Sequence, residues 1–593
     1  MSIYSFSLLT TQSMTETLLT YNNPIKERVG RAKPPRAGLG FLGVALLLAC
    51  YLAIVAAAIA SLEQLAGHPI AGQLPGRALR PLGLWLPARL ADALARFLPF
   101  VDRADLTFHV LVIVLFVLYL ALLWLSWRLA TTAGRRRGVL WLVGGVLLVS
   151  GGILVVAPGM LSHDIFVYAG YGRVMVAHGA NPYFVPLSAF PGDPLTSLDD
   201  WKTAVAAYGP LWLMVCAALS WLLGGNAPAY VLAFRLLALG AHLLNMGLIV
   251  RLLRALGRSQ RVITLGAVLY GLNPLMLIES ALGAHNDVLM MTCLLLGCCC
   301  ADPEGRRLER VRYWLPALVA MLLAVLIKFT ALLGVLLFLC LLLFRTLQRD
   351  GSRQLLLALR LRWRPALTRL LLALGCMVLL VGLAYLPFWL GHSLHDIVVS
   401  LLAPPSTSRD LGQFSILRAI QEWRYYHRQP LGGWTGQMLD LLGQRSTWNL
   451  LQGLALLMAL GVALWLLWEQ PRLERWALGA LLTMGAIFLV TPWFFPWYLV
   501  WLVALAPPAL PERGSSAALE YALQVFVLAF SLSAFAVYFS RGYMPAGGGW
   551  IGWMGLSAVA PPLLAFGLTW LGGWWWGQRQ GTQGGFQRPL SGS

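Results

Sequence analysis

Charged side chains are scarce in this sequence. They make up 11% of its 593 residues, whereas hydrophobic residues make up 59%, and a soluble domain carries about a quarter charged residues. Apolar runs of about 20 residues, the length that crosses a bilayer core, recur from Gly38 almost to the C-terminus. Alternating apolar and polar strands of about ten residues are lacking, which argues against a transmembrane barrel. The sequence therefore predicts an all-α polytopic integral membrane protein.

Acidic residues are scarcer still. The chain has 24 Asp and Glu against 44 Lys and Arg, a net charge of +20. The basic residues gather in short loops between apolar runs, such as "GRRRG" at residues 134–138 and "RLLRALGRSQR" at residues 251–261. Because short basic loops stay in the cytoplasm, the charge indicates topology and not a nucleic-acid partner. The eight Cys lie mainly in apolar segments and show neither a disulfide framework nor a metal-binding spacing.

The basic loops also set the expected layout of the chain. We expect no cleavable signal peptide, because residues 1–37 are polar, and about 12–14 spans with both termini inside. The short apolar stretch at residues 208–224 opens with a Pro and is expected to be an interfacial or re-entrant helix. The predicted parts are a cytoplasmic tail (1–37), a transmembrane module (38–345) with an outer loop (159–226), further transmembrane helices (346–574) with a second outer loop (391–448), and a second cytoplasmic tail (575–593).

Polar side chains stand at the outer ends of predicted spans, where charges are costly and need a reason. The first such stretch is "SHDIFVYAG" at residues 162–170. A desolvated carboxylate has a raised pKa and suits a general base, so Asp164 is a candidate catalytic residue, with His163 beside it. Tyr168 and Arg173 follow as candidate substrate contacts. The alternative is that Asp164 merely caps the helix that follows.

A second stretch, "ESALGAHNDVLMM", begins at Glu279 and places four polar side chains at the turn between two apolar runs. His285, Asn286 and Asp287 are consecutive, which is more polarity than a simple cap needs. We therefore expect the four residues to contact substrate or take part in the reaction. His285 and Asp287 lack a third ligand at useful spacing, so a metal site is not expected.

Lys328, in "AVLIKFTALL", is a lone cation between two half-length apolar segments. Snorkelling to the membrane surface is one explanation, and contact with an anionic lipid headgroup is the other. The aromatic segment "TPWFFPWYLVW" at residues 491–501 includes Trp497 and Tyr498. It could be an interfacial aromatic belt, or it could stack on a sugar ring or enclose an isoprenoid chain.

Two of these stretches resemble the signatures of a known family. "SHDIFVYAGYGRVMVAHGANPYFVP" from Ser162, with "AYGPLW" from Ala207, and "NPLMLIESALGAHNDVLMM" from Asn273 are similar to segments of the bacterial polyprenol-phosphomannose-dependent α-1,6-mannosyltransferases. These are integral membrane glycosyltransferases of the GT-C superfamily. "IKFTALL" and "PWFFPWYLVW" agree more loosely. The resemblance covers about residues 138–344 well and about residues 492–508 loosely.

The resemblance implies a GT-C-like bundle and an inverting mannosyl transfer at the outer face of the cell membrane. The donor would be a polyprenyl-phosphate-linked sugar, and the acceptor would be a glycan or glycolipid hydroxyl. Asp164 would remove the acceptor proton, with Asp287 as the second catalytic candidate, and Tyr208 would contact substrate. No nucleic acid partner and no cofactor are implied. No Gly-rich phosphate loop follows a strand, as a nucleotide donor would need, and we expect no metal requirement.

A secondary transporter or flippase is the principal alternative, because it too would place charges beside a membrane cavity. Such proteins usually show internal repeats and midplane polar sites, whereas no repeat is visible here and the polar stretches lie at span ends. A non-catalytic membrane scaffold is a third reading, and the clustered "SHD" and "HND" argue against it. The sequence does not distinguish mannose from another lipid-linked sugar, and it does not identify the acceptor.

Overall fold

The computed structural model describes the greater part of the chain. The described residues are 37–65, 73–75, 89, 92–93, 96, 103–130, 133–301, 307–308, 310–349, 354–402, 414–426, 433–491, 494–511, 518–538 and 550–584. The chain from Val44 onwards packs as one compact unit, and residues up to Gly43 form a separate unit. The predicted N-terminal tail and the end of the predicted C-terminal tail lie outside the described residues, so their placement stays a prediction.

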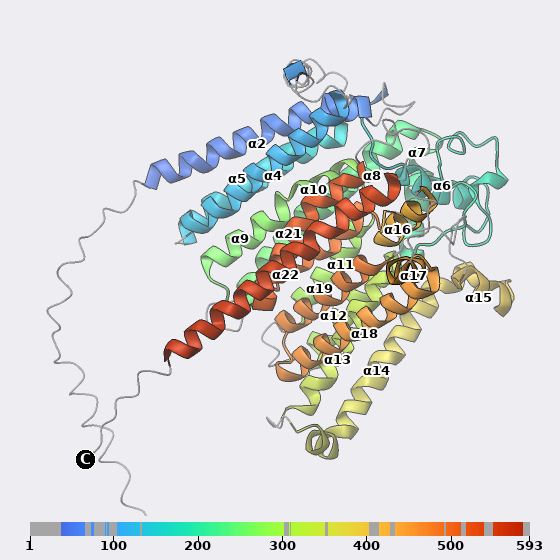
Figure 1. Cartoon of the computed structure of the whole chain (residues 1–593). Coiled ribbons are helices and arrows are strands. Elements are labelled where there is room, and N and C mark those ends of the chain that lie inside the picture. Colours follow the sequence, from blue (N-terminus) through green and yellow to red (C-terminus); the bar gives the residue numbers. More distant parts are fainter. Residues whose placement is uncertain are drawn as a thin grey trace, which may run out of the picture. The chain divides into compact units, whose positions relative to one another are not determined.

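Every regular element among the described residues is a helix, and the long helices of the compact unit run side by side (Figure 1). The first half contains α2 (Ala37–Leu65), α4 (Arg103–Leu129), α5 (Ala133–Val156), α6 (Asp164–Val176), α7 (Pro210–Leu223), α8 (Ala227–Ala255), α9 (Gln260–Gly271), α10 (Pro274–Leu277), the π-helical turn η5 (Ile278–Leu282) and α11 (Asp287–Cys300). The second half contains α12 (Val311–Ile327), η6 (Phe329–Ala331), α13 (Leu332–Leu347), α14 (Leu355–Trp389), α15 (Leu394–Leu402), α16 (Ile416–Tyr426), α17 (Gly433–Leu442), α18 (Arg445–Glu469), α19 (Leu473–Val490), η7 (Pro496–Tyr498), α20 (Leu499–Leu505), α21 (Ala518–Ser533), η8 (Ala534–Tyr538) and α22 (Trp550–Gly584).

Eight described helices are long and apolar enough to cross a membrane, or nine if one bent pair is a single span. The prediction of a polytopic α-helical membrane protein is therefore confirmed. Five further apolar helices among the described residues are shorter, and α11 and α12 are two of them. The expected number of 12–14 spans is reached only when these short helices are counted, because a helix of 14 residues reaches about 21 Å, less than the bilayer core.

Short and bent helices meet at the two polar turns that the sequence predicts. The span expected at residues 262–282 is divided into α9 and the α10–η5 segment, which bend by 49°. Asn273 causes the break, because its side chain accepts the N–H groups of Leu275 and Met276 and so begins a new helix. A second break falls at Lys328, whose extended backbone separates α12 from η6 and α13. Interrupted helices at membrane depth are typical of buried sites.

The element expected to be interfacial is α7, a helix of 14 residues that begins at Pro210. Together with α6 it lies at one end of the long helices of this unit (Figure 1). The predicted outer loop at residues 391–448 contains α15, α16 and α17. Two of its arginines pair within the loop, Arg418 with Glu422 and Arg424 with Asp440.

Candidate active site

The two polar turns come together in the fold. Asp164 is the first residue of α6, and His285 lies in the turn between η5 and α11. The distance from His285 Nδ1 to Asp164 Oδ2 is 3.5 Å, although more than a hundred residues separate the two. The fold thus brings the two polar turns together, and contact of both turns with one substrate stays a prediction. We call five residues the charged cluster: Asp164, Glu279, His285, Asp287 and Lys328.

The carboxylate of Asp164 does not cap its own helix. His163 occupies the capping position of α6, and the hydroxyl of Ser162 accepts the backbone N–H of Asp164 at 3.3 Å. The Asp164 side chain lies instead against His285 and keeps 14% of its surface exposed. Ser162 thus takes over the local role that the helix-cap alternative gave to Asp164.

An irregular backbone places His285. The π-helical turn η5 precedes it, and Ala284 has φ +53°, a left-handed conformation that costs a non-glycine residue about 1–2 kcal/mol. A Cβ on Gly283 would stand 2.7 Å from His285 Cδ2, so glycine allows the turn to close against the ring. Strain and π-helical turns are concentrated at functional sites, which supports a functional role for this turn.

Arg235, on α8, ties the two turns to each other. Its side chain is fully buried, and its four hydrogen bonds all go to main-chain carbonyls. Three of these carbonyls, at distances of 2.6–3.1 Å, precede Asp164 in the segment 155–159, and the fourth is that of Leu282, before His285. Arg235 is not among the site residues predicted from the sequence. A lone Arg within an apolar span was the signal that could have found it.

His285 bridges two carboxylates. Its Nε2 lies 3.2 Å from Glu279 Oε2, and the other oxygen of Glu279 accepts the hydroxyl of Tyr538 at 2.7 Å. The indole of Trp497 stacks on the imidazole, with ring centres 4.2 Å apart and planes inclined by 13°. His285 and Glu279 are buried, with exposures of 0% and 1%. The stacking on His285 shows that Trp497 belongs to the site, whereas its predicted contact with a sugar ring stays a prediction.

Lys328 forms the other half of the cluster with Asp287. Its Nζ lies 2.8 Å from Oδ1 and 3.0 Å from Oδ2 of Asp287. Three rings surround the ammonium group, those of Tyr498 at 5.0 Å, Trp501 at 5.5 Å and Tyr208 at 5.9 Å. The Lys328 side chain is only 10% exposed, so it is held in an aromatic cage and does not snorkel to the surface.

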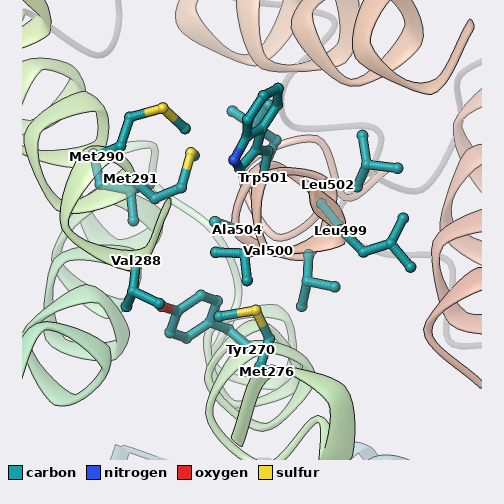
Figure 2. Close-up of a cluster of buried hydrophobic side chains, with 14 of the residues drawn as sticks. Tyr270, Met276, Val288, Met290, Met291, Leu499, Val500, Trp501, Leu502 and Ala504 are labelled. Carbon is teal, nitrogen blue, oxygen red and sulfur yellow. The ribbon is translucent and has the colours of Figure 1, made fainter. Parts of the chain in front are cut away.

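Asp287 is a poor candidate for a proton acceptor in this arrangement. Both of its oxygens contact Lys328, and Oδ1 also accepts the indole N–H of Trp501. Trp501 lies on α20 and belongs to a buried apolar cluster, in which it faces Met290 and Met291 of α11 (Figure 2). The packing of α11 against α20 therefore fixes Asp287, and Asp287 orients the ammonium group of Lys328.

Gly209 joins the first outer loop to the Lys328 turn. Its N–H donates to the carbonyl of Ile327 at 3.0 Å, and a Cβ at this position would stand 2.2 Å from the carbonyl oxygen of Leu326. Only a glycine allows so close an approach of two backbones. This contact explains why the motif "AYGPLW" brings the ring of Tyr208 over Lys328.

The ionisation of the pair Asp164–His285 differs from the expectation. Burial alone would raise the pKa of Asp164, but the contact with His285 and the charges of His285 and Lys328 hold it below its usual value. The predicted raised pKa is therefore wrong, because the desolvated carboxylate has cationic neighbours. Burial lowers the pKa of His285, and the contacts with Asp164 and Glu279 outweigh this and raise it to about 9.

Asn286 is the most unusual neutral group of the site. It is fully buried, and neither its amide nitrogen nor its amide oxygen has a hydrogen-bond partner among the described residues. Leaving a buried amide unpaired costs about 1–3 kcal/mol. Such a group is better explained by a ligand than by folding. Its predicted role in substrate binding stays a prediction, and the geometry supports it.

Three predicted residues have partners or packing outside the charged cluster. His163 lies 2.8 Å from Asp200, which is exposed. Arg173 forms an ion pair with the buried Asp193 at 2.8 Å. Arg173 lies nine residues after Asp164 on α6, which is about 13 Å along the helix at 1.5 Å per residue. The ring of Tyr168 packs edge-on against the rings of Tyr208, Trp212 and Phe234. A catalytic role for His163 and substrate contact by Arg173 and Tyr168 remain untested predictions, and these positions do not support them.

No group of three or more His, Cys, Asp or Glu residues in the described part of the chain is arranged to hold a metal ion. The charged cluster offers carboxylate, imidazole and ammonium groups, which are suited to acid–base and electrostatic catalysis. Asp164 and Lys328, which keep 14% and 10% of their side chains exposed, are placed to meet a substrate, and the more deeply buried members hold them in position.

Residues 83–345 match the family model described as "Alpha-(1->6)-mannopyranosyltransferase, N-terminal domain". This segment holds all five members of the charged cluster. Residues 83–345 are therefore similar to the N-terminal domain of this family. The match ends at the same residue as the first transmembrane module predicted from the sequence, and it confirms the predicted resemblance.

Relatives from three bacteria carry the same family name. The chain is 27% identical over 373 residues to alpha-(1->6)-mannopyranosyltransferase A of Mycobacterium tuberculosis, covering 61% of this chain and 64% of that protein. It is 29% identical over 140 residues to alpha-(1->6)-mannopyranosyltransferase A of Corynebacterium glutamicum, covering 23% and 28%. It is 32% identical over 143 residues to a probable alpha-(1->6)-mannopyranosyltransferase of Mycolicibacterium smegmatis, covering 23% and 25%.

The chain thus spans less than two thirds of the length of each of these relatives. No solved structure matches it. The relatives and the family model are hexosyltransferases by name, which agrees with the class of enzyme expected from the two sequence signatures.

Proposed function

We propose that this protein is an inverting membrane mannosyltransferase. It takes a mannosyl unit from a polyprenyl-phosphate donor and transfers it to a hydroxyl of a glycan or glycolipid acceptor at the outer face of the cell membrane. One observation carries the proposal. Asp164 and Lys328, the two most exposed members of the charged cluster, present a carboxylate and a caged ammonium group.

The two groups match the two halves of the reaction. The acceptor hydroxyl gives its proton to a carboxylate oxygen of Asp164, and its oxygen forms a bond to the anomeric carbon from the face opposite the phosphate. The bond between the anomeric carbon and the phosphate oxygen breaks, and its electron pair leaves with the polyprenyl phosphate. Lys328 stabilises the negative charge that develops on this phosphate.

The low pKa of Asp164 is compatible with this role. A carboxylate that stays ionised at neutral pH is always ready to accept a proton, and the acceptor hydroxyl becomes more acidic as its bond to the anomeric carbon forms. His285, with its pKa raised to about 9, is protonated at neutral pH and cannot itself be the base. Asp164 is therefore the better proton acceptor of the two.

The substitution Asp164→Asn tests this function. Asparagine keeps the size of the side chain but does not accept the proton, so mannosyl transfer should fall by about 10²–10⁴-fold, the scale of acid–base assistance. The assay uses membranes with equal amounts of folded protein, a radiolabelled polyprenyl-phosphate mannose and a panel of glycan and glycolipid acceptors.

Asp440→Asn is the matched control, because Asp440 is exposed and pairs with Arg424 far from the charged cluster in sequence. It should transfer at the wild-type rate. Turnover close to wild type by Asp164→Asn would remove Asp164 from the mechanism. The absence of transfer by the wild-type protein with every donor and acceptor offered would contradict the proposed function itself.

A further inference from the structure

Four residues, from three helical elements and the turn after η5, form a line that ends at the proposed base. Asp164 of α6 lies 3.5 Å from Nδ1 of His285, and Nε2 of His285 lies 3.2 Å from Glu279 of η5. Glu279 in turn accepts the hydroxyl of Tyr538, from η8, at 2.7 Å. The two ring nitrogens of one imidazole thus serve two carboxylates.

The inner members of this line are more deeply buried than Asp164. The side chains of His285 and Glu279 are 0% and 1% exposed, whereas that of Asp164 is 14% exposed. Trp497 covers one face of the imidazole, and Gly283 lies against its edge. Asp164 is therefore more accessible to a sugar or a phosphate than His285 and Glu279 are.

The charges of the line favour a protonated imidazole. Two buried carboxylates face it, and burying an ionised carboxylate without a partner is very costly. The other charged groups near it, Asp287 and Lys328, pair with each other, and Tyr538 is a neutral donor to Glu279. Each ring nitrogen lies within ion-pair distance of one carboxylate, Nδ1 at 3.5 Å from Oδ2 of Asp164 and Nε2 at 3.2 Å from Oε2 of Glu279. The attraction of the imidazolium for Oδ2 leaves Oδ1 of Asp164 for the acceptor.

We infer that Glu279 and Tyr538 are positioning residues, which hold the His285 imidazolium against Asp164 so that one carboxylate oxygen is directed at the acceptor hydroxyl. The inference rests on the proposed function and assigns His285 and Glu279 to positioning the base in place of the substrate contacts expected from sequence. No bond other than those of the transfer itself is formed or broken, because the imidazolium keeps both protons while Asp164 takes the proton of the acceptor.

The pH dependence of kcat/KM is the measurement that a merely structural role would not change. The arrangement is intact while His285 is protonated, so activity should fall as the pH rises through the pKa of about 9. Glu279→Gln removes one of the two anions that favour the proton. The fall of kcat/KM at high pH, the alkaline limb of the pH profile, should therefore move to lower pH by about 1–3 units. This is the usual effect of losing an opposite charge at this distance.

The values of kcat and of the KM for the donor provide a second test. In Glu279→Gln we expect kcat to fall by about 10- to 100-fold, the scale of a small misplacement of a catalytic group, with an unchanged KM for the donor. Glu520→Gln is the matched control, because Glu520 is a partly buried glutamate paired with Arg475 at 2.8 Å on α19. It should leave the pH profile unchanged.

Tyr538→Phe tests the same line from its other end. It removes one hydrogen bond to Glu279 but keeps the charge, so kcat should fall by only about 2- to 10-fold. The alkaline limb should stay in place or move to higher pH, because Glu279 becomes a stronger anion. The two variants thus shift the limb differently, which general damage to the fold would not produce.

An alkaline limb that does not move in Glu279→Gln overturns the inference, as does a raised KM with unchanged kcat, which would indicate direct substrate contact. If Glu279→Gln does not accumulate in the membrane, Tyr538→Phe decides. A wild-type kcat in that variant overturns the inference, and a lowered kcat with the limb at or above its wild-type position supports it. Transfer by the wild-type protein and by Glu520→Gln distinguishes these failures from a failure of the proposed function.

Discussion

At the scale of single residues, the surroundings of Lys328 define what it can bind. Two of its N–H groups point to Asp287, and three aromatic rings surround the rest of the ammonium group. An anionic oxygen is the partner that such a caged cation lacks. Loss of one charge-assisted hydrogen bond costs about 1.5–3 kcal/mol. Lys328→Ala should therefore raise the KM for the lipid-linked donor by about 10- to 100-fold and leave the KM for the acceptor nearly unchanged, measured by varying each substrate in turn.

The control for this experiment must separate donor binding from folding. Removing Lys328 alone leaves Asp287 buried without its cation, which costs about 3–5 kcal/mol. The double variant Lys328→Met with Asp287→Asn removes both charges and should restore much of the stability of the protein in detergent. Its donor KM should remain high. Recovery of wild-type donor use by the double variant would show that Lys328 serves only to neutralise Asp287.

At the scale of elements, Arg235 determines how precisely α5, α6 and η5 meet. Arg235→Lys keeps the charge but cannot reach four carbonyls from one planar group. We expect a lower melting temperature and a fall in kcat of up to about 100-fold, since a shift of about 1 Å between catalytic groups has that effect. The pH profile should keep its alkaline limb, because the anions around His285 are unchanged. Thermal unfolding and the pH dependence of transfer check the two expectations.

Arg251→Lys is the matched control, as Arg251 lies on the same helix α8 with an exposed side chain. It should behave as wild type in both measurements. A fully active and stable Arg235→Lys would show that the two turns meet without this side chain.

The sequence was sufficient to predict those elements whose signal is local. Apolar runs predicted the helical class, and the polar "SHD" and "HND" clusters led to the two turns that meet in the fold. The bend at Asn273 follows from its capping side chain, and the break at Lys328 follows from a lone charge in an apolar run. How deeply these two residues are buried does not follow from the sequence. Pairings between distant segments, such as Glu279 with Tyr538 and Trp501 with Asp287, have no local signal.

The pKa of Asp164 shows the same limit in chemical terms. Burial of a carboxylate at the end of a span correctly suggests an upward pKa shift. The downward shift comes from His285 and Lys328, whose distances from Asp164 are a property of the tertiary structure. The lone Arg235 was visible in the sequence and was overlooked, because the basic residues were interpreted as loops.

At the scale of the whole molecule, the proposed function requires that the charged cluster open to the outer face. The distribution of Lys and Arg predicts this orientation, because the basic stretch at residues 251–261 should stay in the cytoplasm. Ser197 in the first outer loop and Ala255 at the end of α8 are both exposed. A cysteine at position 197 should react with a membrane-impermeant maleimide in intact cells. A cysteine at position 255 should react only after the cells are permeabilised, since the bilayer separates it from the reagent.

The unaltered chain, with its own eight cysteines, gives the background for both labelling reactions, and each variant must still transfer mannose before its labelling is interpreted. Equal labelling of position 197 before and after permeabilisation would agree with an outer-face site supplied by a lipid-linked donor. The opposite pattern, with position 255 labelled in intact cells and position 197 protected, would place Asp164 and Lys328 at the cytoplasmic face. The positive-inside assignment would then be wrong, and the donor would have to reach the charged cluster from the inner leaflet.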